Sequence, residues 1–243
     1  KEFGADLIRL FMMSSAGFDR VADWKDNQVP QVQKKLGELE SILKRGAQAP
    51  VSRVFSEEEE WLSERLKQCL SDAFQAYESM DFMVASQKAF FEPVNEIKRF
   101  RKVFGKDESA AVRMVLDDWI VLISPITPFL AEEAWSTYHD SSSLASTQVV
   151  SRPLGNPSNE VTEKMAFVES VLGDIERVKK LAKKKTPGAI YIYTNSAHDV
   201  ACLNEVKAQL EKYAQLPIKI DDAYDPLEKK ARAQPGKPAL YIE

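Results

Sequence analysis

The sequence predicts a mainly α-helical fold, in which an antiparallel helical bundle is followed by a small α/β domain. Apolar residues recur at helical spacing through most of the first 140 residues. After residue 160, short β-branched and aromatic runs alternate with helical patterns, which is typical of a small α/β domain. Residues 139–160 are rich in Ser, Asn and Pro. We therefore expect a bundle over 27–140, a linker over 141–160 and a C-terminal α/β domain over 161–243.

The first elements are predicted to be amphipathic helices. GADLIRLFMM (4–13) has the spacing of a short, largely buried helix, with Leu7, Ile8, Leu10 and Phe11 as its apolar residues. PQVQKKLGELESILKR then places one apolar stripe over four turns. The stripe consists of Val32, Leu36, Leu39 and Leu43. Both segments are expected to contribute to one core.

Two further helices are predicted before residue 105. Ser56 precedes EEEEW and is a good N-cap, because the acidic residues that follow lie at the positive end of the helix dipole. The apolar stripe that begins at Trp61 continues this helix to about Met80. A second helix runs from about Phe82 to Phe104, and Pro93 predicts a kink or break near Glu92.

The stretch SPITPFLAEEAW (124–135) predicts a joint between two helices. The preceding helix, KDESAAVRMVLDDWIVLI, is apolar on nearly every side and should end near Ile123, since Pro125 follows. Thr127 is expected to cap the next helix, with Pro128 at its first position. Phe129, Leu130 and Trp135 would then turn back into the bundle.

The C-terminal part predicts one long helix and three strands. VTEKMAFVESVLGDIERVKKLAKKK carries a single apolar face and ends at Thr186-Pro187-Gly188. That face comprises Met165, Val168, Leu172, Ile175 and Leu181. AIYIY, LPIKI and PALYIE read as strands, and LNEVKAQLEKYA between the first two reads as a helix.

Composition excludes several classes of protein. No run of about 18 apolar residues is present to span a membrane, and the start KEFGADLIRL has neither a methionine nor a signal pattern, as expected for the interior of a longer protein. Cys69 and Cys202 stand far apart without CxxC spacing, which predicts a reducing, cytoplasmic location and no cysteine-based zinc site. Only two histidines are present, so we also expect no histidine-rich metal site.

No catalytic set is predicted in this chain. His139 falls in the linker and His198 among polar loop residues, so both read as solvated surface histidines. The neighbouring carboxylates at 117–118 and 132–133 would point about 100° apart on a helix and do not form a converging acid–base pair. Phosphate-binding glycine loops are absent as well. We therefore expect no catalytic, cofactor-binding or metal-binding residues here.

Charge is segregated along the chain. The net charge is −4, made up of −6 in the first 160 residues and +2 from 161 to 243. Two basic clusters stand out as candidates for phosphate contacts, and the ordinary reading of each is a solvated helix face. The first comprises Lys98, Arg99, Arg101, Lys102 and Lys106, with Phe100 and Phe104 interleaved and read as core. The second comprises Arg177, Lys179, Lys180, Lys183, Lys184 and Lys185.

Three stretches together resemble a known family. GADLIRLFMMSS followed by ADWKDNQV resembles the segment after the KMSKS loop in class I aminoacyl-tRNA synthetases of the Leu/Ile/Val/Met group, and SPITPFLAEEAW resembles their bundle motif. KKARAQPGKPALYIE, after a lysine-rich helix and AIYIYT, is similar to the C-terminal domain of the archaeal and eukaryotic type of leucyl-tRNA synthetase. Phe129 stands where many members have histidine, which suggests a packing position.

The resemblance implies a role in leucyl-tRNA aminoacylation for protein biosynthesis. Residues 1–26 would connect to a catalytic domain that uses ATP and Mg²⁺; because the KMSKS, HIGH and editing regions are absent, this chain alone is expected to be inactive. The bundle would contact the tRNA body, and the C-terminal domain the long variable arm of leucine tRNA, in a monomer. The implied tRNA-binding residues are Lys98, Arg99, Arg101, Lys102, Arg177, Lys179, Lys180, Lys183, Lys184, Tyr241, Ile242 and Glu243.

Two alternatives and one departure accompany this resemblance. The first two motifs mark the group but not the amino acid, so a fragment of a valyl- or isoleucyl-type enzyme remains a rival. A helical protein-interaction adaptor without RNA affinity is the rival from another class. The C-terminal region is shorter than in the family, and we hypothesise that residues near 195–205 bridge a disordered or deleted segment.

Overall fold

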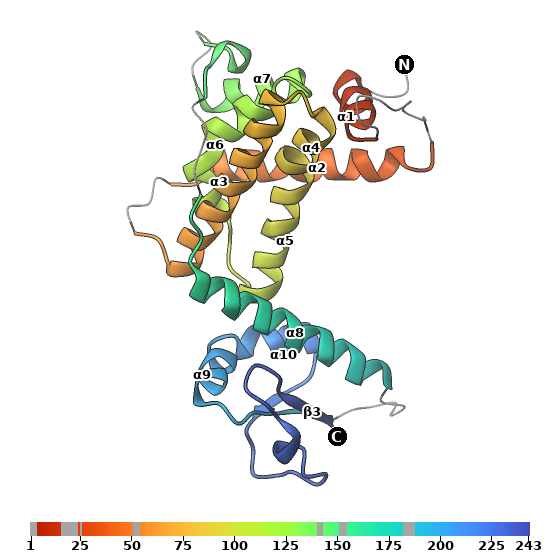
Figure 1. Cartoon of the computed structure of the whole chain (residues 1–243), viewed down its shortest axis with the longest axis vertical. Coiled ribbons are helices and arrows are strands. Elements are labelled where there is room, and N and C mark those ends of the chain that lie inside the picture. The colour runs from red at the N-terminus through yellow and green to blue at the C-terminus, as the bar shows by residue number, and fades with distance from the viewer. Residues whose placement is uncertain are drawn as a thin grey trace. The chain divides into compact units, whose positions relative to one another are not determined.

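The computed structural model describes residues 4–15, 24, 26–50, 54–139, 143–150, 155–181 and 188–243 (Figure 1). The chain divides into two compact units. The first unit consists of Lys1–Arg99 and Asp107–Ser158, and the second unit of Phe100–Lys106 and Asn159–Glu243. The fold is the predicted one, a helical bundle with a small α/β domain at its C-terminus.

The first unit is helical throughout its described elements. These are α1 (Ala5–Ser15), α2 (Val29–Gln48), α3 (Glu57–Glu78), α4 (Phe82–Ser86), the π-helical turn η1 (Gln87–Phe91), the first part of α5 (Glu92–Phe104), α6 (Ser109–Ile123), α7 (Pro128–Tyr138) and the 3₁₀ turn η2 (Ala145–Thr147). Helices α2 and α3 both pack against α6 (Figure 1). The apolar composition of α6 fits this central position, because most of its residues are buried.

The helix patterns of the first unit are confirmed with small differences. Leu39 and Leu43 are buried on α2, whereas Val32 and Leu36 are half-buried and pack against a cluster of Leu7, Phe11 and Val29. Ile8 on α1 is 41% exposed, so that part of the expected buried face is wrong.

The N-terminus of α3 is a capping box. The Glu59 amide donates to Ser56 Oγ at 3.3 Å, and the Ser56 amide donates to Glu59 Oε2 at 2.8 Å. The predicted N-cap at Ser56 is therefore confirmed.

The break predicted near Glu92 is a π-helical turn. Within η1 the Glu92 amide donates to the carbonyl of Gln87, five residues back, and an α-helix resumes with Pro93 in its first turn. In an α-helix, residue 93 would donate to the carbonyl of Ala89, but proline has no N–H. Trp119 Nε1 donates to that carbonyl instead, at 2.8 Å in the buried core.

The joint between α6 and α7 is closed by α1. Thr127 occupies the N-cap position, but its hydroxyl donates to the carbonyl of Ile123 and does not cap α7. The Asp6 carboxylate accepts the amides of Leu130 (2.7 Å) and Phe129 (3.4 Å), while Arg9 donates to the carbonyls at 125 and 126. The N-cap of α7 therefore comes from α1, more than 120 residues away in the sequence.

The Phe129 side chain differs from its expectation. It is 69% exposed, so its interpretation as a packing position is wrong, whereas Leu130 and Trp135 are buried as predicted. Phe129 falls in the first turn of α7, where its backbone amide donates to the Asp6 carboxylate.

Part of the predicted linker packs onto α7. Glu132 accepts the amides of Ala145 (2.9 Å) and Ser146 (3.0 Å), Trp135 Nε1 donates to Ser143 Oγ at 3.0 Å, and Ala145 is fully buried. Gly155 lies against the backbone of α3, where a Cβ would come within 2.1 Å of the Glu64 carbonyl oxygen, and only glycine fits.

The second unit is a three-stranded sheet with helices. After α8 (Asn159–Leu181) come β1 (Ile190–Tyr193), α9 (Ala197–Glu205), α10 (Lys207–Ala214), β2 (Ile218–Ile220), the 3₁₀ turn η3 (Lys230–Arg232) and β3 (Ala239–Ile242). The order is β2-β1-β3, with β2 parallel and β3 antiparallel to β1. The strand predictions are confirmed, and the long helix is confirmed as far as Leu181; its predicted end at Thr186-Pro187 lies outside the described residues. The helix predicted over 203–214 is two helices that meet at Val206.

Residues 195–205 form an ordered element. Ser196 caps α9 by accepting the Asp199 amide at 3.3 Å, and Thr194 Oγ1 donates to Asp199 Oδ2 at 3.1 Å. The hypothesis of a disordered segment here is therefore wrong, and only its deletion version remains.

The side chains of β1 alternate between the two faces of the sheet. Ile190 and Ile192 point to one side and Tyr191 and Tyr193 to the other, and all four are buried. On the tyrosine side, the segment between β2 and β3 is fixed by the Tyr193 hydroxyl, which donates to the Tyr224 carbonyl. Asn195 binds the same segment at the Ala233 carbonyl, at 2.6 Å.

Candidate nucleic-acid interface

Lys98 and Arg99 belong to the first unit, and both have carboxylate partners there. Lys98 Nζ lies 2.6 Å from Glu38 Oε2, and Arg99 Nη1 lies 2.9 Å from Glu96 Oε2. Arg65 binds the same Glu96 carboxylate at 3.3 Å. These two predicted phosphate contacts therefore begin from existing ion pairs, which a polyanion would have to share.

Arg101 and Lys102 lie on the last turn of α5, within the second unit. The side-chain amide of Gln209 donates to both of their carbonyls. Lys102 Nζ lies 4.9 Å from the centre of the Tyr213 ring and 3.9 Å from Glu176 Oε1 on α8. Lys102 is thereby brought next to the second predicted cluster.

The described cations of α8 have different environments. Lys179 Nζ donates to the Ala214 carbonyl at 2.6 Å, beside Tyr213. Lys180 is exposed, one turn beyond Glu176 on the same helix face. Arg177 is 75% exposed and binds Asp174 at 2.9 Å. Lys183 and Lys184 lie outside the described residues.

Lys102, Lys179 and Lys180 together form what we call the α8 cation cluster. Lys102 of α5 and Lys179 of α8 meet at the C-terminal end of α10, and Lys180 follows Lys179 on α8 as an exposed residue. Residues that are 77 positions apart in the sequence thus present positive charge on one part of the second unit. This surface can attract phosphate groups.

The C-terminal strand contributes a second group of predicted residues. Tyr241 lies opposite Tyr191 in the sheet, with ring centres 6.0 Å apart, and Ile242 is half-buried beside Ile190. The Glu243 amide donates to Ala189, and its carbonyl accepts the Gly188 amide. These main-chain groups of Glu243 are therefore engaged in the sheet.

Sequence reasoning missed a polar chain beside Glu243. Lys219 Nζ donates to the Tyr191 hydroxyl at 3.2 Å, which in turn donates to Glu243 Oε2 at 3.2 Å. The hydrogen bond that Lys219 donates to Tyr191 raises the pKa of Lys219 above its ordinary value. Tyr224 is 45% exposed, and the centre of its ring lies 5.2 Å from that of the Tyr191 ring. The sequence predicted β1 and β2 as strands, but not that they would be neighbours.

Neither histidine belongs to a metal-ligand group within the described part of the chain. No group of three or more His, Cys, Asp or Glu residues in that part is placed to hold a metal ion. His139 binds Asp117 at 3.1 Å and stacks on Trp135, and His198 is 78% exposed. In the same part of the chain, no helix combines the length and apolarity needed to cross a membrane.

Comparison with known proteins assigns the fold to a family. The family described as the anticodon-binding domain of tRNA ligase matches residues 59–192, more than half of the chain. The chain belongs to this family. The matched region runs from α3 through β1 and therefore includes the π-helical turn, the α6–α7 joint and α8. The match is to the anticodon-binding domain of these ligases and not to a catalytic domain.

Several archaeal leucine–tRNA ligases are similar to this chain. The enzyme of Methanosarcina mazei is 29% identical over 220 residues, which cover 86% of this chain and 22% of the relative. Those of Pyrococcus horikoshii and Archaeoglobus fulgidus are each 25% identical over all of this chain and 31% of the relative. The chain thus spans between a fifth and a third of the length of these relatives.

The two alignments that include the whole chain are longer than the chain itself. They extend over 303 and 291 residues, whereas this chain has 243. The relatives therefore carry residues with no counterpart here. A deletion near residues 195–205 stays a prediction.

Proposed function

We propose that this chain is the tRNA-binding part of a leucyl-tRNA synthetase. The observation that supports it best is the match of the anticodon-binding family over α3 to β1, combined with leucine–tRNA ligases as relatives over the whole chain. The parent enzyme would ligate leucine to leucine tRNA with ATP and Mg²⁺ in a catalytic domain outside this chain, as a cytoplasmic monomer. Residues 1–26 would connect to that domain.

The two units would contact different parts of the tRNA. The bundle, proposed as 27–140, would lie along the tRNA body, and the C-terminal domain, proposed as 161–243, against the long variable arm. The α8 cation cluster, with Arg101, Arg177, Lys183 and Lys184, would bind backbone phosphates, which position the RNA without reading its sequence. Tyr241, Ile242 and Glu243 would contact the arm tip, where unpaired bases are open to recognition.

A panel of tRNAs tests this proposal. Binding of the purified chain is measured by fluorescence anisotropy with three transcripts: leucine tRNA, leucine tRNA with its variable arm shortened, and valine tRNA. Tightest binding to intact leucine tRNA is expected. Equal binding to all three would favour a valyl- or isoleucyl-type fragment, and no binding to any would favour a protein-interaction adaptor.

Salt dependence and charge reversal test the contact residues. Lys180→Glu is the primary variant, because Lys180 is exposed and its replacement leaves the core intact. Loss of one phosphate contact is expected to reduce the slope of log K against log salt by about 1. Lys44→Glu is the charge-matched comparison: it makes the same change of net charge in the bundle, on α2, where Lys44 pairs with Glu40 at 2.6 Å and with Glu133 at 3.4 Å. Equal effects of both variants would contradict a specific role for the α8 cation cluster.

A further inference from the structure

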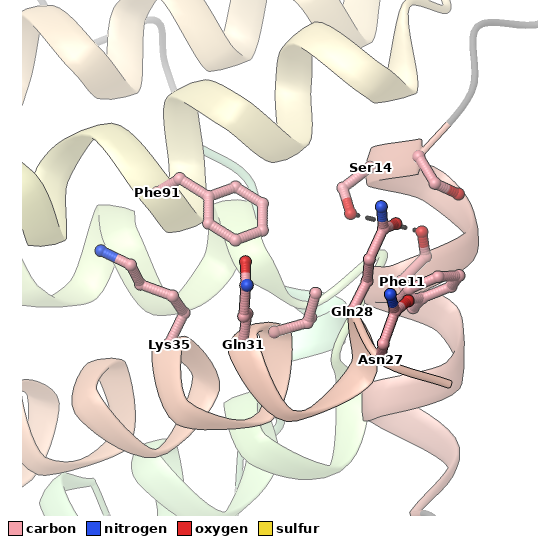
Figure 2. A pocket seen from close by; sticks show the side chains of 9 residues that line it. Phe11, Ser14, Asn27, Gln28, Gln31, Lys35 and Phe91 are labelled. Carbon is pink, nitrogen blue, oxygen red and sulfur yellow. Dashed lines mark hydrogen bonds between the residues drawn. The ribbon is translucent and has the colours of Figure 1, made fainter. Parts of the chain in front are cut away.

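A pocket of about 470 Å³ lies in the first unit. It opens between the end of α1, the start of α2 and η1, as Figure 2 shows. Its volume falls within the range of about 300–1,000 Å³ that small-molecule sites occupy. The description of the matching family names no ligand for this pocket.

The walls of the pocket combine carboxamides with an aromatic ring. Gln31 projects from the first turn of α2, Gln28 and Asn27 directly precede that helix, and Ser14 lies across from them on α1. Phe91 faces Gln31 from the opposite wall (Figure 2). Carboxamides both donate and accept hydrogen bonds, which matches the mixed edge of a nucleobase. An aromatic face offers a stacking surface for any base.

One end of the pocket carries excess positive charge. Lys35 lines it, with Nζ 2.7 Å from Asn95 Oδ1 and 4.0 Å from Glu38 Oε2. The same Glu38 carboxylate is already bound by Lys98 at 2.6 Å. Two ammonium groups therefore share one carboxylate, and burial together with Lys98 lowers the pKa of Lys35. A phosphate placed here would relieve that repulsion.

The π-helical turn directs Phe91 to this position. Relative to an α-helix, η1 inserts one residue, and each residue turns the helix by about 100°. The turn accommodates Pro93 and ends at Phe91, so the break in α-helical geometry coincides with the pocket wall. Such turns occur frequently at functional sites.

We propose that this pocket binds a single unpaired RNA nucleotide, with its base against Phe91 and the carboxamides of Gln28 and Gln31, and its phosphate at Lys35. Recognition of a splayed base by stacking and by hydrogen bonds to its edge is the usual mode for single-stranded RNA. The identity of the ligand as RNA rests on the proposed function; the chemistry of the pocket does not. The site would hold one nucleotide of a tRNA loop while the α8 cation cluster binds backbone phosphates.

The first experiment uses mononucleotides and no tRNA. The chain, labelled with ¹⁵N and with ¹³C at its phenylalanine rings, is titrated with AMP, CMP and ribose 5-phosphate. Nucleotides are expected to shift the Gln31 side-chain amide and the Phe91 ring signals in a saturable manner, and ribose 5-phosphate is not. Equal shifts with ribose 5-phosphate, or shifts confined to other residues, overturn the base-binding inference.

Variants make the assignment specific. Gln31→Ala removes an exposed carboxamide with little risk to folding, and Phe91→Leu removes the ring. Each is expected to weaken mononucleotide binding, read from the Phe91 ring signals in the first variant and from the Gln31 side-chain amide in the second. Gln33→Ala, an exposed residue of the same helix that does not line the pocket, is the control and is expected to bind as the unaltered chain does.

The second experiment separates this inference from the proposed function. Gln31→Ala is expected to weaken tRNA binding roughly two- to tenfold, the effect of one lost hydrogen bond, with an unchanged salt slope because no phosphate contact is removed. If no tRNA binds the unaltered chain, the proposed function fails and the mononucleotide titration still decides the pocket. If tRNA binds and Gln31→Ala binds it equally well, the pocket is not an RNA site and the proposed function stands.

Discussion

Trp119 Nε1 donates a hydrogen bond to the carbonyl of Ala89, the group that Pro93 leaves without a helical partner. The bond is buried and joins α6 to the π-helical turn at 2.8 Å. An unpaired buried carbonyl costs about 1–3 kcal/mol. The indole therefore stabilises the irregular turn that a proline within this helix requires.

Trp119→Phe is expected to lower the free energy of unfolding by at least about 1–3 kcal/mol, since the Ala89 carbonyl loses its partner. Chemical denaturation measures this value. In a double-mutant cycle with Pro93→Ala, residue 93 regains an N–H, so the penalty of Trp119→Phe should shrink. An identical penalty in both backgrounds would show that only lost volume matters.

Asp6→Ala is expected to destabilise the first unit by about 0.5–2 kcal/mol, the usual cost of a lost N-cap. The amides of Leu130 and Phe129 lose their acceptor, although neither residue changes. Asp6→Asn is the matched control, because its amide oxygen can still accept the Leu130 amide, and its loss should be smaller. Thr127→Val separates the two candidate caps: it should leave the α7 N-terminus intact, because the Thr127 hydroxyl binds Ile123.

Glu132 is expected to make the segment after α7 sensitive to acid. Burial acts to raise the pKa of Glu132, but hydrogen bonds from Ser146 and Ala145 outweigh it and hold the pKa below its ordinary value of 4.5. A carboxylate with a lowered folded pKa contributes stability that is complete above the unfolded pKa and disappears as the pH falls through the folded one. Stability measured from about pH 6 to 3 should therefore fall more steeply for the unaltered chain than for Glu132→Gln. If stability falls equally with pH in both proteins, Glu132 does not cause the acid sensitivity.

The two cysteines are expected to be unreactive until the chain unfolds. Burial raises the pKa of Cys69 to about 12 and that of Cys202 to about 11, so the thiolate, which is the reactive form, is scarce. Cys69 belongs to the first unit and Cys202 to the second, so alkylation with iodoacetamide at increasing urea reports on each unit separately. Cys202→Ser isolates the Cys69 signal. Rapid labelling of either thiol in the native chain would contradict the buried environment.

Local patterns predicted the elements, and long-range contacts escaped prediction for a physical reason. Apolar periodicity predicted the α2 stripe, the residues after Ser56 predicted it as the N-cap of α3, and Pro93 predicted the irregular turn. Each of these signals lies within a few residues of the structure that it predicts. The cap of α7 by Asp6 and the bond from Trp119 to Ala89 join residues 124 and 30 positions apart. The local sequence around one partner of such a contact does not indicate where the other partner lies.

The candidate interface divides in the same way. Runs of Lys and Arg marked both clusters, but sequence could not indicate that Glu38 and Glu96 bind Lys98 and Arg99, or that Lys102 would join Lys179 through Tyr213 and Ala214. Carboxamides such as Gln28 and Gln31 carry no distinctive spacing. The pocket they line becomes visible only when α1, α2 and η1 are in place.

The second unit is discontinuous in sequence, because it takes residues 100–106 from the end of α5. The Gln209 side-chain amide donates to two carbonyls of that segment, and Lys102 of the same segment lies over the Tyr213 ring. A gene cut between 140 and 160 would therefore separate the C-terminal unit from part of its own structure. This unit is therefore not a simple C-terminal cassette, because removing or exchanging it would also require rebuilding α5, which ends more than 50 residues before α8 begins.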